Sequence, residues 1–453
     1  MRRKPPTLPS LATKVQDWRH QLWHLPEEES QVRLAEKLEW TALGSRKAAG
    51  LLVPVFVEAL SHPAVLVRQG ASRMLAALGE QTGDLHGVLW EQLKQDDVYL
   101  KGCALMALGR SGAQHLVPSV VQVLHEDHRW SVYAALQAMR VLTVAPGPFL
   151  KRLQELFQHP ERADVGVFPL GPRENATTRG TVRRMLLVAL TELPTTFQVL
   201  LPEVLDCARF PEELYWVSEV LLHWRVDPNA VRQDVLKHLH GGDEKARRAA
   251  LHALVDLRLT VNEESKHLLL DWAARSTHLD QTVLACALWW CAGERQQSIQ
   301  MAIDLFEQGL QRSRGWPFRY HKVLELLWDL GELSPERLER LMDHMQKMHQ
   351  DRGRPDGPML LFLLNKMGNT AMILSEVKKL LETGDQLYWA IQCLKELGTD
   401  AKPLLEVLQI MLEKDEPLIH DARQVIPMLR LWEEVWVRSE LAGLVKGLQV
   451  EQE

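Results

Sequence analysis

The sequence predicts an all-α fold, an α-solenoid in which antiparallel helix pairs stack into a superhelix. The chain has 453 residues, more than a single hydrophobic core usually accommodates. Its composition is that of a folded protein, with 46% hydrophobic and 25% charged residues. Segments with helically spaced apolar residues also recur at a nearly constant interval, which is typical of a repeat architecture.

Two segments recur in the same register. The first comprises residues 52–60 (LVPVFVEAL), 85–93 (LHGVLWEQL) and 116–124 (LVPSVVQVL), and the second comprises 67–75, 100–108 and 131–139. In both series the copies are offset by 33 and then by 31 residues. We therefore predict a repeat of two amphipathic helices, each pair of which must stack on the next to bury its apolar side.

The two helices of a unit differ in character. The first carries a proline, such as Pro54 or Pro118, which we place in the first helical turn because a missing N–H has no cost there. The second is rich in Ala and Gly and can lie close against its neighbours.

Residues 246–254 (ARRAALHAL) resemble the second helix of a HEAT repeat, which typically runs V-R-x-x-A-A-x-x-L. Residues 200–205 and 402–405 are similar to first helices, and 386–398 to a late second helix. The chain thus resembles the HEAT-repeat family, with armadillo-like packing as the near alternative. The resemblance implies roughly ten to twelve antiparallel helix pairs, at the repeat lengths of such families.

In chain order, we expect residues 1–9 to form a basic flexible tail and Ser10 to cap a helix that ends near His24. An N-terminal HEAT-like sub-array would cover 10–158. Residues 159–180, rich in Pro and Gly, predict a long loop or insertion that is either a binding loop or a linker. A middle sub-array at 181–310 and degenerate helical repeats at 311–448 follow, with further breaks at 312–320 and 350–358.

The sequence offers no catalytic, cofactor or metal motif. Phosphate-binding glycine loops, G-x-S-x-G and H-E-x-x-H are absent. The three close histidine pairs lack a third ligand and predict solvated or capping side chains; they are His20/His24, His125/His128 and His238/His240. We therefore expect a protein that is not an enzyme and needs no cofactor.

Cysteine usage and hydropathy bear on location. The five cysteines form no C-x-x-C pair, which predicts reduced, mostly buried thiols and a cytoplasmic protein. No apolar run approaches the roughly 18 residues of a membrane span, so we expect no membrane partner.

Aromatic residues give one candidate binding site. The chain has 15 Trp and only five Tyr, and most Trp sit at helical spacing among core residues. The break at 312–320 instead combines Trp316, Phe318, Arg319 and Tyr320, residue types that are enriched in interface hot spots. It predicts a partner-binding loop, with local packing as the alternative.

Basic residues give a second candidate. Arg68, Lys101 and Arg247 share one repeat position, and further arginines lie on or near the same helices: Arg73, Arg183, Arg184 and Arg248. Together they could form a basic stripe suited to a phosphate backbone. The alternative is a structural ladder, in which acidic residues before the helices act as caps and pair with basic neighbours: Asp96, Asp97, Asp127 and Asp243.

These observations favour a non-catalytic module or scaffold that binds another protein, because solenoids offer extended surfaces. Nucleic-acid binding is a second possibility, since HEAT-like DNA glycosylases resemble this architecture; the net charge of −6 disfavours it. A third possibility is a phycobilin lyase-like HEAT protein, which the chain resembles in its repeat alone.

Overall fold

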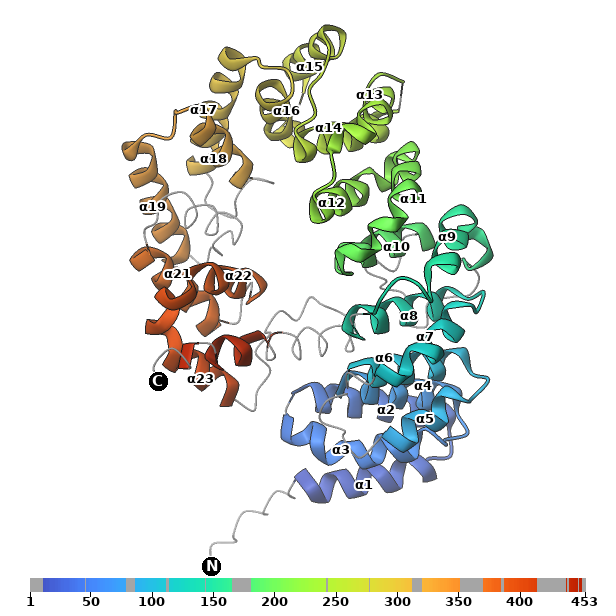
Figure 1. The fold of residues 1–453 in the computed structure, drawn as a ribbon. Helices are drawn as coiled ribbons and strands as arrows, with labels where there is room; N and C mark the ends of the chain where they lie inside the picture. Colours follow the sequence, from blue (N-terminus) through green and yellow to red (C-terminus); the bar gives the residue numbers. More distant parts are fainter. Residues whose placement is uncertain are drawn as a thin grey trace, which may run out of the picture. The chain divides into compact units, whose positions relative to one another are not determined.

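A computed structural model describes residues 11–44, 46–78, 86–110, 114–142, 144–164, 181–241, 243–276, 278–311, 320–350, 370–383 and 387–413, with short pieces between 437 and 449 (Figure 1). These residues form α-helices and short 3₁₀ helices, and none of them lies in a β-strand. The chain divides into two compact units. Unit 1 comprises Met1–Pro194 with Leu408–Val445, and unit 2 comprises Thr195–Val407 with Lys446–Glu453.

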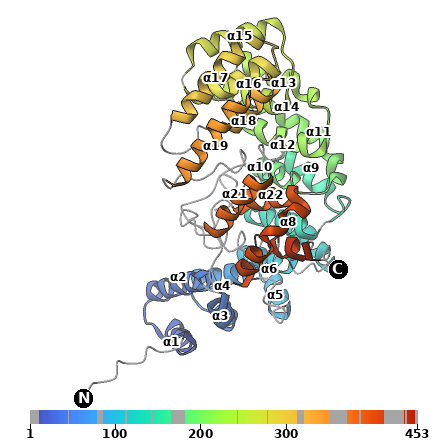
Figure 2. The same ribbon diagram turned by 90° about the vertical axis from the view of Figure 1, so that its left-hand side faces the viewer.

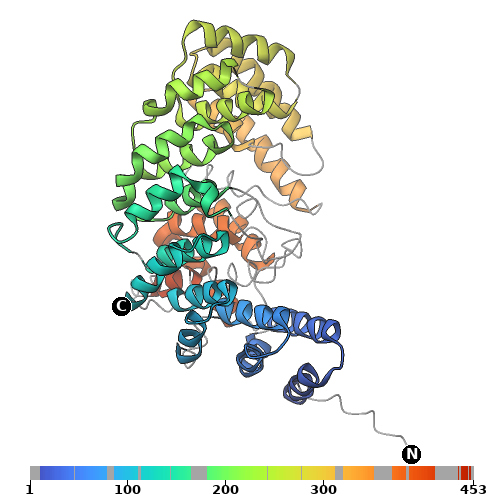
Figure 3. The ribbon, with the colours of Figure 1, turned by 90° about the vertical axis from the view of Figure 1, so that its right-hand side faces the viewer.

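Unit 1 is built from two layers of helices. They are α1 (Leu11–His24), α2 (Glu28–Gly44), α3 (Arg46–Ala59), α4 (Val65–Leu78), α5 (His86–Leu93), α6 (Val98–Arg110), α7 (Val117–Leu124), α8 (Arg129–Leu142), α9 (Leu150–Gln158) and α10 (Val182–Leu190). The even-numbered helices pack on one another in order, from α2 to α10. Each odd-numbered helix packs on the even-numbered helix that follows it (Figure 3).

Unit 2 repeats this arrangement. Its helices are α11 (Leu201–Asp206), α12 (Leu214–Trp224), α13 (Arg232–Gly241), α14 (Glu244–Leu257), α15 (Glu263–Arg275), α16 (His278–Trp290), α17 (Arg295–Gln311), α18 (Tyr320–Asp329), α19 (Pro335–Gln350), α21 (Thr370–Thr383) and α22 (Leu387–Leu397), and α23 spans Leu405–Glu413. Helices α12, α14, α16 and α18 pack on one another in order (Figure 2). We call the even-numbered helices up to α18 the inner layer of their unit.

This architecture confirms the predicted all-α solenoid. The first recurring segment falls mainly in α3, α5 and α7, and the second lies within α4, α6 and α8. Helix α1 begins and ends where the sequence predicts. Residues 1–9, most of the 159–180 break and the break at 350–358 except its first residue lie outside the described residues.

One detail of the prediction was wrong. Pro54 lies inside α3 and not in its first turn, because the helix-favouring residues Arg46–Ala49 extend the helix backwards. A proline at this position cannot donate to the carbonyl of Gly50, four residues earlier. Gly50 is exposed, so water can satisfy that carbonyl. Pro118 does lie in the first turn of α7.

Small residues bring α6 and α8 close together. A Cβ atom on Gly102 would clash with the Trp130 indole nitrogen, and one on Gly109 would lie 3.2 Å from Ala138. Trp130 is completely buried, and its indole N–H donates to the carbonyl of Tyr99 at 3.2 Å. The glycines therefore set the distance between two neighbouring repeats.

The turns before inner helices carry side-chain caps. Asp97 accepts from the N–H groups of Tyr99 and Leu100 at the start of α6, and Asp243 accepts from Ala246 in α14. Both caps confirm the prediction for these aspartates. Asp127 instead pairs with the buried Arg152 of α9 at 2.7 Å.

All five cysteines are buried thiols outside any disulfide, as predicted. Burial raises the pKa of the Cys291 and Cys393 thiols to about 12, so both stay protonated at neutral pH. None of the described helices combines the length and hydropathy of a membrane span.

Candidate functional site

Residues Trp316, Phe318 and Arg319 of the predicted partner-binding loop lie outside the described residues, and Tyr320 is the first residue of α18. The role of this loop therefore stays a prediction. The helix that follows it, however, contributes to a group of interacting aromatic and charged side chains.

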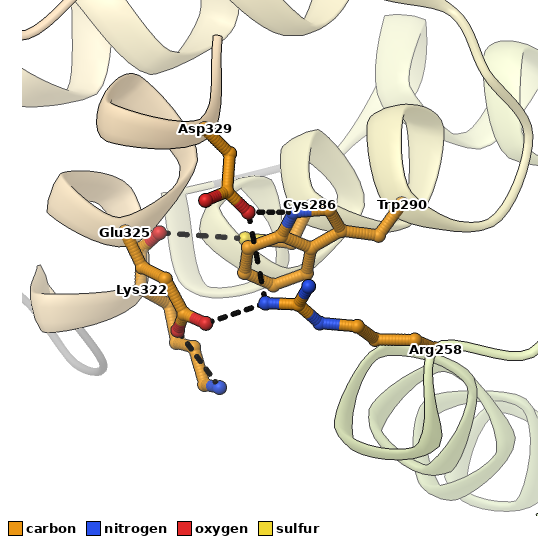
Figure 4. Close-up of polar contacts among 6 residues, drawn as sticks. All are labelled: Arg258, Cys286, Trp290, Lys322, Glu325 and Asp329. Carbon is orange, nitrogen blue, oxygen red and sulfur yellow. Dashed lines mark hydrogen bonds and ion pairs between the residues drawn. The ribbon is translucent and has the colours of Figure 1, made fainter. Parts of the chain in front are cut away.

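This group joins three consecutive inner helices of unit 2 (Figure 4). Arg258 directly follows α14, and Trp290 is the last residue of α16. Lys322, Glu325 and Asp329 lie on α18. We call these five residues the Trp290 cluster.

The Trp290 indole lies at the centre of the cluster. The Arg258 guanidinium is 4.6 Å from the ring centroid and the Lys322 ammonium is 5.4 Å from it. The indole N–H donates to Asp329 Oδ2 at 2.9 Å, which fixes the ring orientation. Two cations therefore lie against one aromatic ring, and the negative face of the ring attracts both of them electrostatically.

Ion pairs complete the cluster. Arg258 Nη2 lies 2.7 Å from Glu325 Oε1 and 3.6 Å from Asp329 Oδ2. Lys322 Nζ lies 3.2 Å from Glu325 Oε2. In addition, the buried Cys286 thiol donates to the carbonyl of Lys322 at 3.7 Å. The cluster thus balances two cations with two carboxylates and connects α16 to α18.

Arg258 adopts a backbone conformation that is unfavourable for an L-residue. Its φ is +50°, and it ends α14 in a turn where the N–H of Leu259 donates to the carbonyl of Leu254 at 3.0 Å. The left-handed region costs a non-glycine residue about 1–2 kcal/mol. Arg225, which ends α12 with a φ of +54°, occupies the equivalent position one repeat earlier.

The cluster is accessible to solvent. The Arg258 side chain is 53% exposed, and Trp328, next to Asp329, is 39% exposed. Exposed ion pairs contribute only about 0–1 kcal/mol to stability. Trp and Arg side chains are therefore exposed at this surface, and these residue types dominate the energetics of protein interfaces.

Several residues of the predicted basic stripe already hold partners. Lys101 pairs with Glu126 at 2.6 Å, and Arg248 pairs with Glu244 at 2.8 Å and Asp280 at 3.2 Å. The Lys101–Glu126 and Arg248–Asp280 pairs connect successive repeats, which is the form of the alternative, a structural ladder.

The remaining stripe residues are distributed over both units. Arg68 donates to the carbonyls of His62 and Pro63, and Arg183 donates to the carbonyl of Phe157 at 3.4 Å. Arg73, Arg184 and Arg247 lie in α4, α10 and α14 respectively. Because Arg247 and Arg248 belong to unit 2 and the others to unit 1, a single continuous stripe stays a prediction.

The close histidine pairs make local contacts. The His20 and His24 rings stack at 4.0 Å, His128 accepts from the N–H of Trp130 at the start of α8, and His240 contacts the Ser265 hydroxyl at 2.7 Å. Within the described part of the chain, no three His, Cys, Asp or Glu side chains are grouped so that they could hold a metal ion.

Sequence reasoning missed the Trp290 cluster because its members are up to 71 residues apart, from Arg258 to Asp329. They meet only through the stacking of α14, α16 and α18. One signal was available: Arg225 and Arg258 both directly follow an inner helix and are 33 residues apart, the length of one repeat.

No family model matches the sequence, and no curated protein matches it. Among solved structures, an engineered protein is 15% identical with a TM-score of 0.34 over 97% of this chain and 99% of its own. Kap121p is 12% identical with a TM-score of 0.35 over 94% of this chain and 49% of its own.

A third similar structure is Kap95p, solved in a study of its binding to RanGDP; it is 13% identical with a TM-score of 0.39 over 99% of this chain and 64% of its own. The chain thus spans about half to two thirds of the length of these Kap proteins. At such low TM-scores the proposals below rest on this chain's own residues.

Proposed function

We propose that this chain is a non-catalytic module that binds another protein, and that the Trp290 cluster forms part of the binding surface. The observation that carries the proposal is the strained, half-exposed Arg258, which lies on the Trp290 indole.

A purely structural role explains the cluster poorly. The backbone strain at Arg258 costs about 1–2 kcal/mol. The exposed ion pairs and the cation–π contact return a similar amount, about 0.5–1 kcal/mol each. As a clamp between helices, Arg258 would therefore add little net stability, whereas strained backbone is typical of functional positions.

Partner binding explains the same features well. Asp329 fixes the Trp290 ring and Glu325 fixes the Arg258 guanidinium, so these side chains lose little conformational entropy when a partner covers them. The exposed Trp328 extends the surface along α18. A partner that offers apolar and carboxylate or carbonyl groups would match both the indoles and the guanidinium.

The test compares two arginines in the same backbone conformation. Arg258→Ala removes the cluster's cation, and Arg225→Ala removes the equivalent arginine of α12, for which no cation–π or ion-pair contact is seen among the described residues. The full-length tagged chain and both variants would be used to capture proteins from native lysate, with quantification by mass spectrometry. Circular dichroism would verify that each variant is folded.

We expect a reproducible partner whose capture falls by about tenfold in the Arg258→Ala variant, the loss of about 1.4 kcal/mol that a hot-spot residue contributes. Arg225→Ala should capture it like the unchanged chain. Equal capture by all three proteins would place the interface elsewhere, and the absence of any reproducible partner would contradict the proposed function.

A further inference from the structure

Four successive inner helices of unit 1 are cationic to an unusual degree. Helices α4, α6, α8 and α10 contain eight Lys and Arg and no Asp or Glu. In unit 2, by contrast, inner helices α12, α14, α16 and α18 contain four Lys and Arg and six Asp and Glu. The imbalance is therefore a property of these four helices and not of the repeat, since inner helix α2 contains two Lys and Arg and four Glu.

Five of these cations lie in the first turn of their helices, on four successive repeats. They are Arg68, Lys101, Arg129, Arg183 and Arg184, and we call them the basic edge. All five side chains are partly exposed. Four of the five belong to the predicted basic stripe, and Arg129 is new.

Helix stability does not favour this placement. The N-terminal end of a helix carries a partial positive charge, so a cation there is unfavourable by about 0.3–1 kcal/mol. Asp and Glu are the usual residues, as in α15, which begins with Glu263 and Glu264. None of α4, α6, α8 and α10 has an acidic residue in its first turn.

Contacts place the first turns of α6 and α8 side by side, and α4 and α10 pack on these two helices. The Trp130 indole N–H, at the start of α8, donates to the carbonyl of Tyr99, at the start of α6. Lys101 reaches Glu126, just before α8, at 2.6 Å. The basic edge thus runs across neighbouring repeats.

The chain itself shows which anion the basic edge accepts. Glu126 is held by Lys101 and by the Ser131 hydroxyl, each at 2.6 Å, and Asp164 lies 3.3 Å from Arg129. Both carboxylates lie in loops and pair with the cations of the two middle helices, α6 and α8. At the outer helices the caps are neutral: His62 accepts from Ala64 before α4, and Thr181 accepts from Arg184 in α10.

We infer that the basic edge binds an extended, carboxylate-rich segment of a partner protein. Packed helices are about 8–10 Å apart, and an extended chain rises about 3.3 Å per residue. Two carboxylates roughly seven to nine residues apart would therefore meet the two outer helices, α4 and α10, which are three helix spacings apart. The arginine guanidinium donates two parallel hydrogen bonds to a carboxylate, which adds specificity to the charge attraction.

Nucleic acid is a poorer match for this surface. The chain's net charge of −6 opposes a long polyanion. The Tyr and Trp residues of these helices, Tyr99, Trp130 and Tyr133, are buried, so they offer no platform on which bases could stack. The inference concerns a surface separate from the Trp290 cluster and stands or falls independently of it.

Fluorescence anisotropy with the full-length chain tests the inference. The probe is a labelled oligoglutamate of about 12 residues, long enough to cross four helices, and an oligothymidylate of similar length serves as the nucleic-acid probe. The variant Arg68→Gln/Arg184→Gln neutralises the outer helices of the basic edge. The matched variant Lys245→Gln/Arg247→Gln removes the same charge from α14 in unit 2.

We expect the peptide to bind at about 50 mM salt and to dissociate as salt rises, with affinity about tenfold lower in the basic-edge variant and within about twofold of the unchanged chain in the α14 variant. The basic-edge variant should melt close to the temperature of the unchanged chain, because the removal of cations from helix N-termini offsets the loss of the Arg68 hydrogen bonds to the carbonyls of His62 and Pro63. Equal losses in both variants, or no peptide binding, would overturn the inference. Tighter binding of the oligothymidylate would overturn it in favour of nucleic acid.

Discussion

Two arginines of this chain occupy a backbone conformation that glycine normally takes. Arg225 and Arg258 end α12 and α14 with positive φ, whereas Gly293, Gly331 and Gly398 take this conformation elsewhere in unit 2. The left-handed residue reverses the chain after a helix. The Arg258 side chain also takes part in the Trp290 cluster. A comparison of the two positions therefore separates the effect of backbone strain from the effect of the side-chain contacts.

Replacing each arginine with glycine should therefore have different effects. Arg225→Gly relieves the strain and should raise the free energy of unfolding by about 1 kcal/mol. Arg258→Gly relieves the same strain but loses the ion pairs and the cation–π contact, so its gain should be smaller by about 0.5–2 kcal/mol. Urea denaturation followed by circular dichroism measures both, and equal gains would show that the cluster contributes nothing to stability.

His128 is a second residue whose environment has a measurable consequence. Its Nδ1 accepts from the N–H of Trp130 at 3.1 Å, which requires an unprotonated nitrogen. Burial lowers the pKa of His128, partly opposed by the nearby Glu126 carboxylate. The unfolded chain therefore binds a proton more readily than the folded chain in the pH window just below the unperturbed value of about 6.5.

It follows that the stabilisation from neutral His128 is fully present above pH of about 6.5 and is lost as the pH falls below it. His128→Asn keeps an acceptor for the Trp130 N–H and cannot titrate. The free energy of unfolding should fall less steeply between about pH 7 and pH 5 in this variant than in the unchanged chain. Parallel pH profiles for the two proteins would assign the dependence to other groups.

At the scale of elements, the distance between α6 and α8 depends on two glycines and an alanine. Gly102 faces the Trp130 indole and Gly109 faces Ala138. Because the Trp130 indole N–H is also hydrogen-bonded to Tyr99, it cannot move away without losing that bond. The close approach of these helices therefore depends on the absence of a side chain at position 102.

Gly102→Ala should lower the free energy of unfolding by about 1–3 kcal/mol, the usual cost of overpacking. Gly50→Ala is the matched control, since Gly50 lies inside α3 and a Cβ there meets no atom within 4 Å. It should raise stability by about 0.5–1 kcal/mol through helix propensity. Thermal melts of both variants distinguish the effects, and a Gly102→Ala protein as stable as the control would contradict the packing argument.

The helices themselves could be predicted because their signals are local. The 33- and 31-residue offsets located α3 to α8, and Asp97 and Asp243 marked helix starts. Contacts between repeats could not be read in this way. The pairing of Arg258 with Glu325 joins positions 67 residues apart, and it depends on the packing of α14, α16 and α18 in order.

The chain divides into two units, and the stability of each is approximately the sum of contacts between its neighbouring helices. The predicted solenoid captures this correctly. The predicted functional residues were harder to place, since Trp316, Phe318 and Arg319 lie outside the described residues and the basic residues divide between the two units. The basic edge was identified from the charges of whole inner helices, more than from the charge at one position of the repeat.

The ion pairs that connect repeats also have a direction along the chain. In Lys101–Glu126, Arg129–Asp164, Arg248–Asp280 and Lys266–Glu294 the cation comes first and the carboxylate follows 25 to 35 residues later; Arg152–Asp127 and Arg340–Glu307 run the other way. At about 5–20 residues per second on the ribosome, each of those four cations emerges a few seconds before its carboxylate. These four pairs can therefore form only after the following repeat has emerged, so they contribute to the packing of each repeat on the one before it.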